Sequence, residues 1–214
     1  MFEYDKHKFK PSEEMIKSAI SKKLLKGRLL YEKGMKPSGL YYIKSGVIGL
    51  INYTASGSES LLRIFSEGDF VGHRSFIAEE NYHANSSVLS DSEILFFPCE
   101  SVEHLLKIYP ALFLFLTKQI AKDLRSSEDR LNDLSGKKVF LRIAESLLYL
   151  KTKEPTYNWT RREIGEFCGA KTETVTRALT QLVHEGVIRK EGRDIIIPSI
   201  NHFIAFLKNE ELKD

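Results

Sequence analysis

The spacing of apolar residues along this chain changes near Ser101, and this change limits the folds that the chain can adopt. Before it, short apolar stretches are separated by turn residues, which is the pattern of successive β-strands. The stretches are Leu29–Tyr31, Leu40–Ile43, Val47–Tyr53, Leu61–Phe65 and Ile94–Phe97. After it, apolar residues recur every three or four positions, as in helices. We therefore expect an α+β chain with an N-terminal sandwich, roll or barrel. A doubly wound nucleotide-binding fold is not expected, because it needs strands and helices in alternation.

Composition and length are those of an ordinary folded protein. The 214 residues are 42% hydrophobic and 29% charged, which is enough apolar material for one large domain or two unequal ones. The longest purely apolar run, Ala111–Leu116, is too short to cross a membrane, and the first residues have no apolar signal-peptide centre. Two cysteines, Cys99 and Cys168, lie too far apart for a metal-binding or redox spacing. We expect a cytoplasmic protein with reduced thiols and no membrane partner.

A long helix is predicted from Pro110 to Gly136, because proline favours the first helical turn and Ser135–Gly136 ends the periodic pattern. One narrow stripe at heptad spacing runs along it between charged faces. The stripe consists of Phe113, Ile120, Leu124, Ser127, Leu131 and Leu134. Such a stripe favours a coiled-coil seam between two copies of the chain. The alternative is that it covers the domain's own core.

The chain is therefore expected to have three parts. Residues 1–109 form the β-domain, with a helix over residues 11–26 packed on its outside, residues 110–136 form the long helix and a hinge, and residues 137–214 form a second domain that opens with a helix near Lys137–Lys151. Lys and Arg outnumber Asp and Glu by 14 to 11 over residues 136–214, against 18 to 18 over residues 1–135. Excess positive charge in one module is a modest indication of nucleic-acid binding, since phosphate contacts need local cations.

Residues 160–197 carry the most informative pattern. Thr160 followed by Glu163 is a capping box at the start of a short helix, Arg161 to Cys168, which Gly169 ends. A second helix is predicted from Lys171–Thr172 to His184. Its expected buried residues are Val175, Leu179, Leu182 and Val183. Two short strands with a basic tip between them follow, Val187–Arg189 and Ile195–Ile197. Helix, glycine turn, helix and hairpin in this order are typical of a winged helix-turn-helix.

The polar residues of this second helix form a candidate DNA-reading surface. In its first two turns, the side chains opposite the buried face are Thr172, Glu173, Thr176 and Arg177. A carboxylate can accept a hydrogen bond from a cytosine amino group, and an arginine can bond guanine or a phosphate. Further DNA-binding candidates are the basic residues Arg161, Lys171 and Lys190. The alternative for Glu173 and Arg177, four positions apart, is a solvent-exposed ion pair within the helix.

Several motifs in fixed order point to one family. In the N-terminal part they are LLYEKGMKPSGLYYIKSGVIGL, with Gly34 and Gly46, and FSEGDFVG, with Gly68, Asp69 and Gly72; in the C-terminal part the motif is TRREIGEFCGAKTETVTRAL followed by GVI. On these motifs, residues 28–199 resemble the Crp/Fnr family of bacterial transcription regulators. The resemblance implies a jelly-roll-like effector (sensor) domain, a dimerisation helix and a winged helix-turn-helix that binds double-stranded DNA as a homodimer. It also implies contact with RNA polymerase if the protein is an activator.

The effector pocket departs from the pattern of the cyclic-AMP-binding members. These have a glutamate after the Gly-Asp-Phe turn that holds the ribose, and further along an arginine that pairs with the cyclic phosphate. Here His73 stands at the glutamate position and His83 near the arginine position. The degenerate pocket consists of Gly72, His73, Arg74, Ser75, His83 and Ala84. A neutral histidine lacks the charged fork that a phosphate site uses. Gating by ordinary cyclic AMP is therefore not expected, with Arg74 as an alternative cation.

Other cofactors have less support in the sequence. Iron–sulfur members of the family need a cysteine cluster, mostly near the N-terminus, and this chain has no cysteine before Cys99. A haem with His73, His83 or Cys99 as axial ligand, or another nucleotide, stays open. A metal-binding triplet of the cupin kind, a Ser-His-Asp arrangement and paired carboxylates do not stand out. We expect no metal, no catalytic residues and no enzymatic activity.

The resemblance also indicates a DNA site. The chain keeps Glu173 and Arg177 but has Thr172 where relatives of the cyclic AMP receptor carry an arginine, an arrangement closer to the Fnr-like branch. This predicts a homodimer on an inverted repeat of TTGA-like half-sites, about 34 Å apart. The alternative function is a ligand- or haem-sensing protein that acts through protein contacts without sequence-specific DNA binding.

Overall fold

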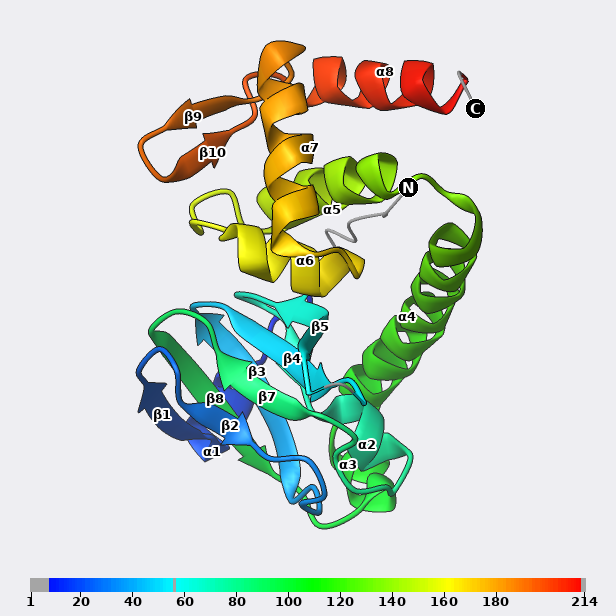
Figure 1. Cartoon of the computed structure of the whole chain (residues 1–214). Coiled ribbons are helices and arrows are strands. Elements are labelled where there is room, and N and C mark those ends of the chain that lie inside the picture. Colours follow the sequence, from blue (N-terminus) through cyan, green and yellow to red (C-terminus); the bar gives the residue numbers. More distant parts are fainter. Residues whose placement is uncertain (1–7, 56, 213–214) are drawn as a thin grey trace. The chain divides into compact units, whose positions relative to one another are not determined.

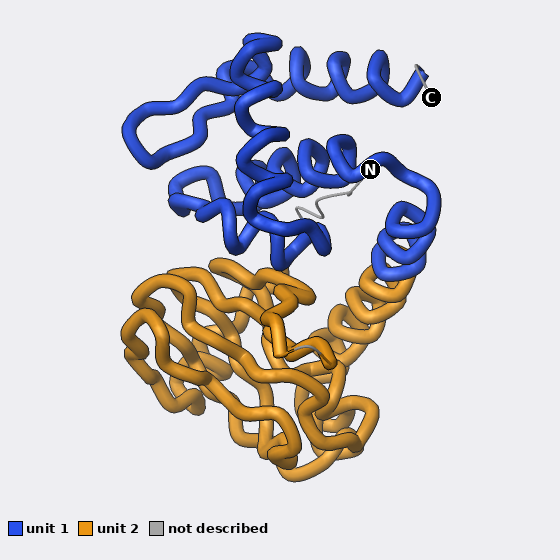
Figure 2. The backbone as a smooth tube through the Cα atoms, in the orientation of Figure 1, with its two compact units in different colours: residues 1–4, 126–214 blue, residues 5–125 orange. Residues whose placement is uncertain are grey.

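The computed structural model describes residues 8–55 and 57–212 (Figure 1). They form two compact units: the described residues up to Arg125, and residues 126–212 (Figure 2). The boundary lies within one continuous helix, α4 (Pro110–Gly136), so the last turns of this helix belong to the second unit. The long helix is confirmed with the bounds that its first proline and its Ser-Gly end predict.

The first unit contains two four-stranded antiparallel sheets, so the predicted β-domain is confirmed. One sheet has the order β1 (Ile20–Leu24), β8 (Ser92–Pro98), β3 (Gly39–Ser45) and β6 (Phe70–Val71). The other has the order β2 (Leu29–Tyr31), β7 (Asn85–Val88), β4 (Ile48–Tyr53) and β5 (Glu59–Phe65). We call this pair of sheets the roll.

The core of the roll lies on both faces of the first sheet. On β3, Tyr41 and Ile43 point into the cluster between the two sheets, while Leu40 belongs to a second cluster. This second cluster joins the sheet to helices α1 (Glu13–Ser18), α2 (His73–Ile77), α3 (Val102–Ile108) and the start of α4. Alternating side chains of β3 are buried on opposite faces, because a layer covers the sheet on each side.

The predicted N-terminal helix over residues 11–26 is wrong in its second half. Helix α1 ends at Ser18, and Ala19 is already extended, with φ −82° and ψ 151°. Residues 20–24 form β1, which pairs with β8 in register from Ile20 opposite Phe96 to Leu24 opposite Ser92. Pairing with a distant strand outweighs the local helical spacing, because intrinsic propensity is a weak preference that tertiary contacts override.

Besides β1, three elements of the first unit were not predicted. They are β6, α2 and β7. Strand β6 has only two residues, and β7 has the sequence Asn-Ser-Ser-Val, which has no apolar alternation even though Ser86 is fully buried. Their structure depends on pairing with β3 and with β2 and β4, which the local sequence does not show.

The second unit is a winged helix-turn-helix, as predicted. Helices α5 (Val139–Lys153), α6 (Arg161–Cys168) and α7 (Thr172–His184) precede the hairpin of β9 (Arg189–Glu191) and β10 (Asp194–Ile196), the wing. Helix α8 (Ile200–Glu211), which the sequence reasoning did not include, follows with Ser199 as its N-cap. Among the described residues, no helix is both long and apolar enough to span a bilayer.

Two details of this unit differ from the prediction. Strand β9 begins at Arg189 rather than at Val187, and β10 begins at Asp194 rather than at Ile195. Val187 and Ile188 precede β9 and are buried. Val183 was predicted to be buried and is 37% exposed. It lies beside the fully buried Leu182 in the last turn of α7, outside the stripe formed by Val175, Ala178, Leu179 and Leu182.

Candidate nucleic-acid interface

Helix α6 begins with the predicted capping box and leads into a closely packed turn. The Glu163 N–H donates to the Thr160 hydroxyl at 3.2 Å, and the Thr160 N–H donates to the Glu163 carboxylate at 2.8 Å. Gly169 ends the helix in the left-handed conformation, with φ 69°. A Cβ atom on Gly165 would lie 2.5 Å from the Ala170 carbonyl oxygen. The direction of α7 is therefore closely tied to that of α6.

Helix α7 buries one face and exposes the other. Its buried residues are Val175, Ala178, Leu179 and Leu182. Thr172, Glu173 and Arg177 are exposed, and Thr176 is partly exposed. The Thr176 hydroxyl donates to the Thr172 carbonyl at 2.9 Å, so this hydroxyl hydrogen is already used within the helix. The four predicted DNA-reading residues thus share the solvent side of α7.

The charged side chains of α7 are not paired with each other. In the part of the chain that the structure describes, no hydrogen bond or ion pair joins Glu173 to Arg177. An ion pair at the same four-residue spacing does form on α6, where Arg162 Nε donates to Glu166 Oε1 at 2.6 Å. An intrahelical ion pair therefore forms on α6 and not on α7. The Glu173 carboxylate and the Arg177 guanidinium are thus available for hydrogen bonds to base edges.

Three further predicted cations lie at the start of α6, at the start of α7 and on the wing. Arg161 begins α6, Lys171 is the N-cap residue of α7, and Lys190 lies in β9; all three are exposed. Gly192, with φ 61°, lies in the turn between β9 and β10, and this hairpin extends outward from beside α7 (Figure 1). Cations at the start of both helices and on the wing are suited to phosphates on either side of a groove that holds α7.

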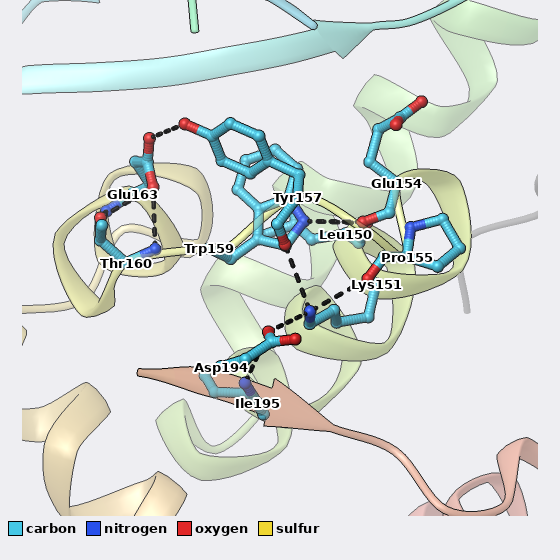
Figure 3. Close-up of polar contacts among 10 residues, drawn as sticks. All are labelled: Leu150, Lys151, Glu154, Pro155, Tyr157, Trp159, Thr160, Glu163, Asp194 and Ile195. Carbon is cyan, nitrogen blue, oxygen red and sulfur yellow. Dashed lines mark hydrogen bonds and ion pairs between the residues drawn. The ribbon is translucent and has the colours of Figure 1, made fainter. Parts of the chain in front are cut away.

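A buried lysine that sequence reasoning missed attaches the wing to the rest of the unit (Figure 3). The Lys151 ammonium donates to Asp194 Oδ1 at 2.6 Å and to the carbonyl oxygens of Pro155 and Tyr157 at 3.2 Å. The hydrogen bond from Lys151 lowers the pKa of the Asp194 carboxyl group. Local sequence gave no signal for this role, because a lysine in the last turn of a helix usually lies in solvent.

The loop before α6 is fixed by two aromatic side chains (Figure 3). Trp159 is buried, and its indole N–H donates to the Leu150 carbonyl at 3.1 Å. The Tyr157 hydroxyl donates to Glu163 Oε1 at 2.6 Å, and burial, then this carboxylate, raises the pKa of the tyrosine. The carboxylate of the capping box is thus held from two sides, which fixes the start of α6.

The predicted seam on α4 divides into a covered and an exposed part. Phe113 packs against the core of the roll, as the alternative to a dimer seam would require, and Ile120 is partly buried. Ser127 is exposed, and the leucines remain open to solvent in the single chain. Their exposed fractions are 60% for Leu124, 66% for Leu131 and 51% for Leu134. The part of the stripe beyond Ile120 therefore does not cover the chain's own core.

The predicted effector pocket has a buried histidine where cyclic-AMP-binding relatives have a glutamate. Gly72 is left-handed, with φ 85°, and His73 follows as the first residue of α2. His73 Nδ1 lies 3.0 Å from the Phe70 carbonyl oxygen and therefore carries the hydrogen. Burial, with help from the charge of Arg63, lowers the pKa of His73 to about 4. The ring is thus neutral near pH 7, and Nε2 presents a lone pair.

The cation of the pocket is already paired within the protein. Arg74 donates from Nη1 to His83 Nδ1 at 3.0 Å and from Nη2 to Glu80 Oε2 at 3.2 Å. Burial and then the Arg74 charge lower the pKa of His83. Ser75 and Ala84 are buried. The structure therefore brings Arg74 and His83 together, as a hydrogen-bonded pair.

Two tyrosines that were not predicted as pocket residues lie beside Gly72. The rings of Tyr31 and Tyr82 stack with centroids 3.6 Å apart and planes 12° apart. A Cβ atom on Gly72 would lie 3.2 Å from the Tyr82 hydroxyl oxygen, which is buried without a hydrogen-bond partner among the described residues. The sequence could not predict that these two rings stack, because Tyr31 and Tyr82 are 51 positions apart.

The candidate haem ligands all have neighbours within the protein. His73 and His83 make the contacts given above, and the Cys99 thiol donates to the Ser101 carbonyl oxygen at 3.4 Å. Burial raises the pKa of the Cys99 thiol, which disfavours the thiolate that binds metals. In residues 8–55 and 57–212, no group of three or more His, Cys, Asp and Glu side chains has a metal-binding arrangement.

Family models match both units. A model described as a cyclic nucleotide-binding domain matches residues 21–109, and one described as a Crp-like helix-turn-helix domain matches residues 141–205. Together they cover the roll, most of the second unit and the elements that hold the predicted DNA-reading residues.

Individual relatives agree with these models over most of the chain. The Anaerobic regulatory protein of Bacillus subtilis is 31% identical over 186 residues, covering 82% of this chain and 78% of that protein. The cAMP-activated global transcriptional regulator CRP of Salmonella typhimurium is 28% identical over 179 residues, covering 78% and 84%. The solved structure of FixK2 from Bradyrhizobium japonicum has a TM-score of 0.76 at 22% identity, covering 87% of this chain and 96% of that chain, which shows a shared fold.

Proposed function

The chain belongs to the Crp/Fnr family and is a DNA-binding transcription regulator, and from this premise we propose that it acts as a homodimer on an inverted repeat. The observation that carries the proposal is the exposed face of α7, where Glu173 and Arg177 are unpaired with each other and flanked by exposed cations. The exposed leucines of α4 supply the seam between the two copies. An activating role would add contact with RNA polymerase.

The proposed half-site is of the TTGA type. Thr172 offers no charged fork at the start of α7, so the charged readers are Glu173 and Arg177, with the Thr176 methyl and hydroxyl oxygen beside them. A carboxylate and an arginine one turn apart can read neighbouring base pairs in the major groove. Two such helices related by a two-fold axis require an inverted repeat with centres about 34 Å apart.

Fluorescence anisotropy on a TTGA–N–TCAA duplex and on a scrambled one tests this proposal. We expect the specific duplex to bind at least about a thousandfold more tightly. Arg177→Ala should remove most of that preference, whereas Lys190→Ala should weaken both duplexes by a similar factor because it removes a phosphate contact. Equal affinity of the unaltered protein for both duplexes, or selection of direct repeats from random DNA, would contradict the proposal.

We also propose that ordinary cyclic AMP does not gate this protein. His73 is neutral and buried at the position of the ribose-binding glutamate, and Arg74 is engaged by His83 and Glu80. A cyclic phosphate would have to compete with both partners for the Arg74 guanidinium. The anisotropy measurement, repeated on ligand-stripped protein with saturating cyclic AMP, should give the same affinity. An increase of about tenfold or more would show a gated protein.

A further inference from the structure

Arg130 attaches the last turns of α4 to the first helix of the helix-turn-helix. Its Nη2 atom donates to the Phe167 carbonyl oxygen at 2.7 Å, and its guanidinium carbon lies 4.5 Å from the centroid of the Phe167 ring. This carbonyl belongs to the last turn of α6, where backbone oxygens have no partner within the helix and form the negative end of its dipole. One arginine thus supplies a charged hydrogen bond and a cation–π contact at the same residue.

Neighbouring contacts make the attachment stiff. The ring of Tyr149, from α5, is stacked on Phe167 with centroids 5.5 Å apart and planes 8° apart. About one helical turn beyond Arg130, the Cδ2 atom of Leu134 lies 3.6 Å from the position of a Cβ atom on Gly169. Three helices, α4, α5 and α6, therefore meet at Phe167 within one compact unit.

The attachment extends from α6 to α7. The Ala170 N–H donates to the Gly165 carbonyl at 2.9 Å, and Gly165 in turn has no room for a side chain against Ala170. Helices α6 and α7 are therefore expected to move as one body. Arg130 holds the end of α6 against the last turns of α4. It therefore also affects the direction of α7 relative to α4.

We propose that Arg130 determines the spacing between the two half-sites that the dimer accepts. This inference rests on the proposed homodimer, in which the α4 seam defines the two-fold axis. The distance of each α7 from that axis then depends on how firmly each helix-turn-helix is held to its own α4. One base pair of spacer changes the half-site separation by about 3.4 Å and the rotation between half-sites by about 35°. A loosened attachment would accept spacers that a stiff one rejects.

The test uses the full-length protein and duplexes that differ only in spacer length. The inverted repeat is made with its best spacer and with spacers one and two base pairs shorter and longer. For the unaltered protein, we expect the best spacer to bind about tenfold more tightly than its neighbours. For Arg130→Ala, we expect the best spacer to lose about tenfold in affinity and the spacers to become nearly equal. Base preference within each half-site should stay, because α7 is unchanged.

Two variants separate this role from loss of charge or of folding. Arg125→Ala removes an exposed cation from the same helix five positions earlier and should keep the sharp spacer preference. Arg130→Lys keeps the positive charge without the planar guanidinium and should give an intermediate preference. Thermal melting of each variant shows whether it is folded; if Arg130→Ala unfolds, Arg130→Lys carries the test.

The outcomes distinguish this inference from the proposed function. A sharp spacer preference in both Arg130 variants would overturn the inference and leave the proposed function standing. Loss of base preference within the half-sites together with loss of spacer preference would show general damage to the helix-turn-helix, which also overturns it. An unaltered protein that selects neither spacer nor half-site would refute the homodimer on an inverted repeat itself.

Discussion

The ammonium nitrogen of Lys151 lies 2.6 Å from the Asp194 carboxylate, and this pair joins the last turn of α5 to the wing. The lysine side chain is buried, whereas that of Asp194 is about one-third exposed. Two backbone carbonyls complete the surroundings of the ammonium group (Figure 3). The wing is therefore positioned by a buried residue that lies 43 positions away from Asp194 in sequence.

Lys151→Met should destabilise the second unit. The change removes the ammonium donor from the Asp194 carboxylate, which keeps the Ile195 N–H, and from two carbonyl oxygens. Removal of one partner of a buried pair costs about 3 kcal/mol of unfolding free energy. Urea unfolding followed by the fluorescence of Trp159, the single tryptophan of the chain, measures this unit. Lys190→Met, an exposed control, should change the same free energy by less than about 0.5 kcal/mol. Equal effects of the two changes would contradict the anchoring role.

Gly165→Ala should disrupt the turn between α6 and α7. Its Cβ atom would lie 2.5 Å from the Ala170 carbonyl oxygen, so the backbone has to move, at a cost of about 1–3 kcal/mol. Gly136→Ala is the matched control, because a Cβ atom there meets nothing within 4 Å, and it should be neutral or slightly stabilising. Urea unfolding and DNA affinity of both variants check the prediction. A fully stable, fully active Gly165→Ala would show that the turn is looser than described.

His73 should make the stability of the roll depend on pH. Its pKa is lowered from 6.5 to about 4 by burial and by Arg63, so the folded roll favours the neutral ring. Its contribution is complete above about pH 6.5 and is lost as the pH falls toward 4, by about 3 kcal/mol in total. Carboxylates lie nearby as well, including Asp123, whose Oδ2 lies 4.0 Å from His73 Nε2.

His73→Gln isolates the contribution of the ring. The variant should show a smaller decrease in the urea midpoint between pH 6.5 and 4, because it lacks the contribution of the His73 ring. The carboxylates are the same in both proteins and contribute equally. Near-ultraviolet circular dichroism of the tyrosines follows the roll in this measurement, since Tyr31, Tyr41 and Tyr82 are buried there. The same pH dependence in both proteins would assign the effect to the carboxylates.

Leu131→Asp should weaken the proposed dimer. Leu131 is 66% exposed in the single chain, and a carboxylate on both sides of a seam would be desolvated and face its own copy. We expect the dimer dissociation constant, measured by analytical ultracentrifugation, to rise about a hundredfold or more. Leu106→Asp changes an exposed leucine of α3 in the same way and should leave the constant unchanged. A dimer that tolerates Leu131→Asp would place the seam elsewhere.

Sequence predicted the second unit better than the first, because its signals are local. The capping box of Thr160 and Glu163 and the left-handed Gly169 each act within one turn of the chain, and they define the bounds of α6 as predicted. In the roll, β1 and β7 form only because strands far away in sequence pair with them. Helical spacing over residues 11–26 therefore led to the wrong element after Ser18.

The candidate site shows the same division. The exposed face of α7 follows from helical periodicity alone, so the exposure of Glu173 and Arg177 could be predicted, and their role in reading DNA stays a prediction. Lys151, Tyr82 and Arg130 were not predicted, because their burial and their partners depend on how separate elements pack. A lysine or arginine on a predicted helix is assigned to solvent until the tertiary structure shows a carbonyl or a ring beside it.

Strand β1 also bears on how this protein avoids edge-to-edge pairing of its sheets. It is an outer strand of its sheet, and among the described residues it pairs only with β8. Such an edge can extend into the sheet of another molecule unless charge opposes the approach. Lys22 and Lys23 lie at the centre of β1, both exposed, and Lys22 is kept in place by the Phe96 ring, 4.8 Å away. Lys22 and Lys23, which lie in the segment predicted to be helical, thus oppose aggregation through the edge of this sheet.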